Sequence, residues 1–138
     1  MPSNPMNYPI PAGITVELSC ESKAAYYQQV TITTDNSDFS CVFQGTGEDI
    51  PMLINNNQMM TNIASQGEDY NLILYFEYST DGGRPGTFKP AHINNEPKIQ
   101  HPTADITLAW VSSEDSTDND NNDSVLRLEY WPQEAEKL

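Results

Sequence analysis

The chain has 138 residues, of which 37% are hydrophobic, so its length suits one domain with a modest core. Twenty acidic residues against six basic ones give a formal net charge of −14. This charge excludes nucleic-acid binding, which needs clustered lysine and arginine, argues against anionic membranes, and suits a cation-binding or surface-exposed protein.

The N-terminal stretch MPSNPMNYPIPAG is rich in proline and has no strand pattern, so residues 1–9 are predicted to be a tail before a domain of residues 10–138. It also lacks a charged segment followed by an apolar one, so no conventional signal peptide is expected. No apolar run approaches the roughly 18 residues of a membrane span, so membrane insertion is not expected. A secreted or cell-surface location would therefore depend on another export route.

Short runs of alternating apolar and polar residues predict strands along the chain. The clearest are GITVELSC, QQVTITT, FSCVFQG, NLILYFEYS, ADITLAWVS and SVLRLEYW. In ADITLAWVS the predicted apolar face holds Ile106, Leu108 and Trp110. In SVLRLEYW the apolar face includes Leu126 and Leu128, which alternate with charged residues.

Turn-forming clusters separate these runs, among them TDNSD, GTGED, ASQGED, STDGGRPG and INNEP. No window shows the i, i+3, i+4, i+7 apolar stripe of an amphipathic helix. Short strands at this spacing predict an all-β protein, an antiparallel β-sandwich of about nine strands.

The sequence offers little for catalysis. His92 and His101 stand alone, and there is neither a C-x-x-C pair for zinc nor a G-x-S-x-G nucleophile motif. We therefore expect a protein that is not an enzyme. Cys20 and Cys41 lie on predicted neighbouring strands, and the sequence leaves open whether they form one bridge or two buried thiols.

The most unusual segment is SSEDSTDNDNNDS, residues 112–124, which holds five acidic side chains between Glu114 and Asp123. It interrupts two of the best predicted strands, which is how a rigid sheet presents a functional loop. Dense carboxylate and amide oxygens are the ligands that Ca²⁺ prefers, whereas Mg²⁺ takes fewer carboxylates and keeps several waters. The segment therefore predicts a calcium site.

An EF-hand is the nearest alternative, because Asp118, Asp120, Asn122 and Glu129 take its first, third, fifth and twelfth positions. It fails at the sixth position, where Asp123 replaces the glycine of the turn, and in its flanks, which alternate like strands rather than helices. The other alternative is a solvated acidic loop without a ligand.

The longer stretch SSEDSTDNDNNDSVLRLEYWP resembles the signature of the bacterial fucose-binding lectin II family, S-E-D-G-T-D-N-D-x-N-D-A followed by an alternating strand that ends in W-P. Ser116 replaces the glycine of that pattern and Ser124 the alanine. Weaker similarity in IPAGITV, QQVTITTDN, VFQG and DGGRPG extends the resemblance over about Ile10 to Pro132.

The resemblance implies that residues 10–138 are a calcium-dependent lectin domain for fucose- or mannose-type sugars. Two adjacent Ca²⁺ ions per subunit would be coordinated directly by sugar hydroxyls. The implied metal ligands in this segment are Glu114, Asp118, Asp120, Asn122 and Asp123. The implied sugar contacts are Asp115, Asp118, Asp120 and Asp123.

A further ligand and the specificity loop of that family lie after the first strand. Counted from the upstream strand the matching residues are Glu21, Ser22 and Lys23, and counted back from QQVTI they are Lys23, Ala24 and Ala25. We favour Glu21 as the metal ligand because Lys23 cannot coordinate a cation. Ser22, Lys23 and Ala24 are then the expected sugar contacts, and the preferred sugar stays open.

Chains of that family end just after W-P-x-G, and their terminal carboxylate reaches a partner's calcium site, which implies a homodimer or larger homo-oligomer. Here QEAEKL follows Pro132, and Glu134 takes the position of the final residue. This tail and the altered specificity segment support one alternative function. It is a calcium-stabilised structural or protein-interaction module that has lost sugar binding.

Overall fold

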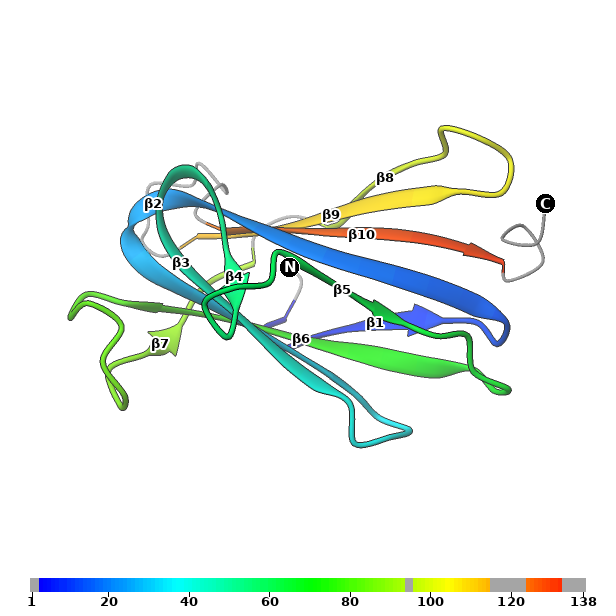
Figure 1. Cartoon of the computed structure of the whole chain (residues 1–138), viewed down its shortest axis with the longest axis horizontal. Coiled ribbons are helices and arrows are strands. Elements are labelled where there is room, and N and C mark those ends of the chain that lie inside the picture. Colours follow the sequence, from blue (N-terminus) through cyan, green and yellow to red (C-terminus); the bar gives the residue numbers. More distant parts are fainter. Residues whose placement is uncertain (1–2, 94–95, 115–123, 133–138) are drawn as a thin grey trace.

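The structure is a computed structural model that describes residues 3–93, 96–114 and 124–132. Within these ranges it contains strands and no helix, which confirms the predicted all-β antiparallel sandwich (Figure 1). No helix long and apolar enough to cross a membrane occurs in the described ranges. The strands are β1 (Met6–Ile10), β2 (Ile14–Thr34), β3 (Ser40–Pro51), β4 (Leu53–Ile54), β5 (Met60–Ile63), β6 (Tyr70–Ser79), β7 (Lys89–Pro90), β8 (Lys98–Gln100), β9 (Thr107–Ser113) and β10 (Ser124–Pro132).

The long strand β2 links the two layers. Its first half pairs with β10 and β5, and its second half pairs with β6 and β3. Sequence analysis predicted two separate strands, GITVELSC and QQVTITT, where the structure has one strand of 21 residues. The register with β3 shifts between Ser22 and Lys23 and again between Ala24 and Gln28, and such irregularities bend a strand. Figure 1 shows β2 turning back on itself at one end of the molecule.

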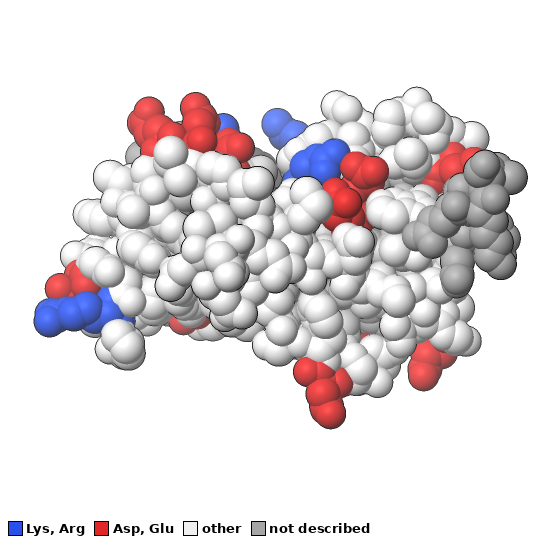
Figure 2. Space-filling view, in the orientation of Figure 1, with Lys and Arg blue, Asp and Glu red and all other residues white. Residues whose placement is uncertain are grey.

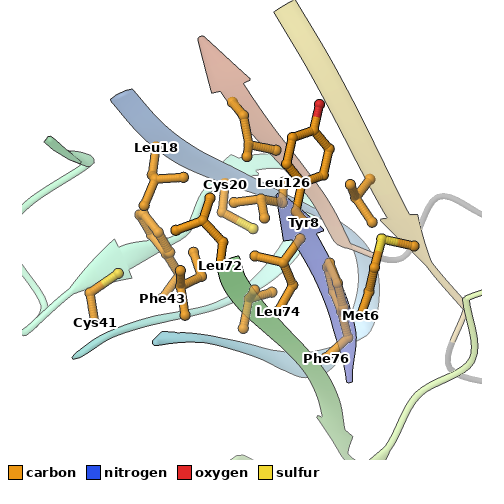
Figure 3. Packing of buried hydrophobic residues seen from close by; sticks show 14 of the residues in the cluster. Met6, Tyr8, Leu18, Cys20, Cys41, Phe43, Leu72, Leu74, Phe76 and Leu126 are labelled. Atoms are coloured by element: carbon orange, nitrogen blue, oxygen red, sulfur yellow. The ribbon is translucent and has the colours of Figure 1, made fainter. Parts of the chain in front are cut away.

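The hydrophobic core fills the space between the layers. Side chains from β1, β2, β3, β6 and β10 point toward one another there (Figure 3). Its largest fully buried members include Phe43, Phe76, Leu126 and Leu128. Burial of each such side chain stabilises the fold by about 1.5–3 kcal/mol. The alternation predicted for SVLRLEYW is confirmed, because Leu126 and Leu128 face inward.

The prediction of which face of ADITLAWVS is buried was wrong. Ala109 and Val111 are buried in β9, whereas Leu108 and Trp110 are half-buried on its outer side. The register with β10 explains this: Val111 pairs with Leu126, and paired residues point to the same side of a sheet. Both faces of this run are apolar, so its own periodicity could not decide which face is buried.

The N-terminal segment also differs from the prediction. Residues 6–9 of the expected tail belong to β1, where Met6, Tyr8 and Ile10 are buried and alternate with exposed residues. β1 pairs with β6 at one end of the strand order. The Tyr8 hydroxyl lies 2.8 Å from that of Tyr130, so β1 and β10 are joined across the layers.

Both cysteines are free thiols buried in the core, which excludes the bridge left open by the sequence. The Cys20 Sγ donates to the Met52 Sδ at 3.5 Å. Burial raises the pKa of Cys41 to about 12 and also raises the pKa of Cys20. Neither thiol is therefore a reactive nucleophile in the folded protein.

Candidate functional site

The acidic segment begins and ends at neighbouring points of the sheet. β9 and β10 are antiparallel, and Ser113 at the end of β9 pairs with Ser124 at the start of β10. Both lie at the end of the molecule where β2 bends (Figure 1). Five predicted site residues lie outside the described residues: Asp115, Asp118, Asp120, Asn122 and Asp123. The structure therefore defines the base from which the acidic segment leaves.

Glu114, the first acidic residue of the segment, is completely buried. Its backbone forms an isolated bridge with His92, with two N–H···O=C hydrogen bonds of 2.8 Å. The backbone N–H of Ala91, the residue before His92, donates to the carbonyl of Phe76 in β6 at 3.0 Å. The segment that contains His92 is therefore held against β6. A carboxylate is costly to bury unless its charge is balanced. Glu114 therefore joins the start of the acidic segment to the buried interior of the fold.

Three serines form a buried polar row beside Glu114. Ser22, Ser124 and Ser113 are paired neighbours on β2, β10 and β9, and all three are completely buried. The Oγ atoms of Ser113 and Ser124 lie 2.5 Å apart. Sequence analysis did not predict this row, although serines at the inward positions of strands that flank an acidic segment were a usable signal. The row places buried, hydrogen-bonded hydroxyl groups at the two points of the sheet where the segment starts and ends.

The residues of the predicted specificity segment divide between two faces of β2. Ser22 and Ala24 are buried, whereas Glu21 and Lys23 are partly exposed on the other face. The Lys23 Nζ lies 2.9 Å from the Glu21 carboxylate and 2.6 Å from that of Asp49. The hydrogen bonds to Asp49 and to Glu21 raise the pKa of Lys23, which stays charged. The structure thus brings two predicted site residues, Glu21 and Lys23, into direct contact.

A pocket of about 450 Å³ opens on the outer face of β2, β10 and β9 beside this ion pair. It is lined by Ser19, Cys20, Glu21, Lys23, Pro51, Met59, Met60, Trp110, Val125 and Arg127. Sequence analysis did not predict this pocket, because its walls come from separate strands that the alternation alone does not bring together.

In the described ranges, no three His, Cys, Asp or Glu side chains gather into a group that could hold a metal ion. The predicted ligands concentrate instead between residues 114 and 123, where five of ten residues are acidic. Acidic side chains also form several separate patches on the face seen in Figure 2. A net charge of −14 attracts cations to the whole molecule. The acidic segment differs from the rest of the surface in how closely its acidic residues follow one another in the sequence.

The fold and the acidic segment agree with the comparisons to known proteins. The chain matches the family described as Fucose-binding lectin II (PA-IIL) over residues 8–133. The chain therefore belongs to the fucose-binding lectin II family, whose members are carbohydrate-binding lectins. No curated protein sequence matches the chain.

Solved structures of bacterial lectins share the fold. The lectin CV2L of Chromobacterium violaceum, solved with alpha-methyl-fucoside, is 24% identical with a TM-score of 0.64, and 94% of this chain and 97% of that chain are covered. A high-affinity mannose-binding lectin of Ralstonia solanacearum is 24% identical with a TM-score of 0.63, and the match covers 91% of this chain and 95% of that chain. The C-terminal domain of the BC2L-C lectin of Burkholderia cenocepacia is 19% identical with a TM-score of 0.62, and the match covers 96% of this chain and 98% of that chain.

Proposed function

We propose that this protein is a non-enzymatic, calcium-dependent lectin that binds fucose- or mannose-type sugars through its acidic segment. The observation that supports this most is the family match over residues 8–133, which includes the whole acidic segment. Two of the similar structures are described by their fucoside ligand and by mannose binding. In this chain the paired ends of β9 and β10 hold the base of the segment.

The donor set fits calcium. Glu114, Asp118, Asp120 and Asp123 supply four negative charges, which two Ca²⁺ ions would balance, and Asn122 adds an amide oxygen. Bound calcium would supply coordination positions for vicinal sugar hydroxyls, and the carboxylate of Asp115 would accept a hydrogen bond from the sugar. Glu114 is completely buried at the start of the segment, where a bound cation would offset part of the cost of burying its carboxylate.

The second part of the proposed site is the segment at the bend of β2. Glu21 remains the proposed further ligand, and Ser22, Lys23 and Ala24 the proposed sugar contacts. The buried Ser22 and Ala24 would act through their backbone, whereas Lys23 is 33% exposed in its side chain and can reach a sugar. Coordination by Glu21 would require its carboxylate to leave Lys23, and Asp49 is placed to retain that ammonium.

A glycan array probed in calcium and again in chelator tests this proposal. We expect signals for fucosides or mannosides in calcium and none in chelator. Asp120→Asn should abolish them, whereas Asp38→Asn, which removes an exposed carboxylate from the loop between β2 and β3, should retain them. Calcium-dependent melting without any glycan signal would instead identify the structural or interaction module. Turnover of a chromogenic glycoside would overturn the non-enzymatic assignment.

We also propose that the chain forms a homodimer or larger homo-oligomer. The proposal rests on the family, and it is tested by light scattering of the purified protein in calcium. A mass of one 15.4 kDa chain at micromolar concentration would contradict it.

A further inference from the structure

The pocket on the outer face of β2, β10 and β9 has mainly apolar walls. Met59 and Met60 enclose it on the β5 side, where they are 55% and 47% exposed, and Trp110 and Val125 come from β9 and β10. Exposed methionines adapt their shape to an apolar ligand, and the indole offers a flat surface. The volume of about 450 Å³ lies within the range of small-molecule sites, roughly 300–1,000 Å³.

The pocket shares two residues, Glu21 and Lys23, with the proposed sugar site. Val125 directly follows Ser124, the described end of the acidic segment, and it pairs with Glu21 of β2. Glu21 and Lys23 both line the pocket, and Glu21 is also the proposed further metal ligand. A sugar that contacts Lys23 and a cation held by Glu21 would therefore lie at the edge of this pocket.

The two cationic side chains of the pocket, Lys23 and Arg127, already contact carboxylates. Lys23 contacts Glu21 and Asp49, and Arg127 contacts Glu129 at 2.8 Å and Glu17 at 3.9 Å. Neither cation therefore calls for an anionic ligand. The surface left for a ligand is that of the two methionines, the tryptophan and the valine, which favours a neutral apolar group.

We propose that this pocket binds the apolar aglycone of a glycoside whose sugar is held at the acidic segment, and this inference rests on the proposed function. An aryl or alkyl group attached to the anomeric oxygen would pass Val125 and lie between Met60 and Trp110. The protein would then recognise glycoconjugates through two connected parts. The acidic segment would select the sugar, and the pocket would select what the sugar is attached to.

Calorimetry in calcium with methyl and phenyl α-glycosides of both fucose and mannose tests the inference. We expect the wild-type protein to bind the phenyl glycoside of its preferred sugar about tenfold more tightly, which corresponds to about 1.4 kcal/mol. Met60→Ser and Trp110→Leu should each remove that preference and leave affinity for the methyl glycoside unchanged. Ile99→Ser, which alters an equally exposed apolar residue outside the pocket, should retain it.

Equal wild-type affinity for the methyl and phenyl glycosides would overturn the aglycone assignment while leaving the lectin function standing. A preference that persists in both pocket variants would also overturn it. Failure of every methyl glycoside to bind would overturn the proposed function, and the aglycone pocket with it. Unchanged methyl-glycoside affinity in the variants shows that they are folded, so a lost preference reports on the pocket itself.

Discussion

Glu114→Gln is expected to lower the stability of the protein more in calcium than in chelator. Glutamine has the same shape as glutamate but carries no charge, and Glu114 is completely buried. In chelator, the lower cost of burying an amide offsets part of what is lost with the charge, so the change in stability should be small. In calcium it should be less stable, because one charged ligand has been removed.

The size of the calcium effect follows from linkage. Calcium at about 100 times its Kd stabilises the folded protein by about 2.7 kcal/mol. Loss of outer-shell partners alone weakens metal sites about 10–100-fold, so loss of a charged ligand should weaken binding by about 100-fold. At the same calcium concentration the variant would then gain only about 0.4 kcal/mol. The difference of about 2.3 kcal/mol corresponds to roughly 5–9 °C in Tm.

Thermal unfolding followed by circular dichroism, in calcium and in chelator, measures both effects. Glu68→Gln is the matched control, since it removes an exposed carboxylate from the loop before β6 and should keep the full calcium shift. The reasoning is refuted if Glu114→Gln also keeps the full shift, or if the variant loses stability equally in calcium and in chelator.

Three further predictions concern the fold. Leu126→Ala should lower the free energy of unfolding by about 2–5 kcal/mol, because Leu126 is completely buried, and a loss under 1 kcal/mol in urea titration would contradict the packing. Raised pKa values at Cys41, about 12, and at Cys20 keep both thiols protonated in the folded state, so stability should hold below about pH 8.5 and fall as pH rises toward 12. Urea titrations between pH 7 and 11 measure this, and a rise in stability would contradict it. Tyr8→Phe and Tyr130→Phe in a double-mutant cycle should show a coupling of about 1 kcal/mol, and additive effects would indicate no hydrogen bond between the hydroxyls.

The strands that the sequence predicted well are those with one apolar and one polar face. In β10, Leu126 and Leu128 alternate with Arg127 and Glu129, so only one orientation buries apolar surface. The run around Trp110 has apolar residues on both faces, and its orientation depends on pairing with β10. The continuity of β2 was also beyond sequence reasoning, because its bend at Ala24–Gln28 carries no proline or glycine to mark it.

For the candidate site, the sequence predicts a ligand chemistry, and the structure adds surroundings that the sequence does not predict. The density of carboxylates after Glu114 predicts a cation ligand, and this stays a prediction, whereas the resemblance to the lectin family is confirmed by the family match. The backbone bridge from Glu114 to His92 was not predictable, because it joins segments far apart in the sequence without a side-chain signature. The ion pair between Lys23 and Asp49 was likewise not predictable, because β3 brings Asp49 beside β2 only in the folded chain.

The central claim is that the acidic segment binds calcium and that bound calcium creates the sugar site. Isothermal titration of calcium into metal-free protein, followed by titration of methyl fucoside or mannoside, tests it most directly. We predict two calcium ions per chain and sugar heat only after calcium has been added. Absence of calcium heat at millimolar concentration, or equal sugar binding in chelator, would contradict the claim.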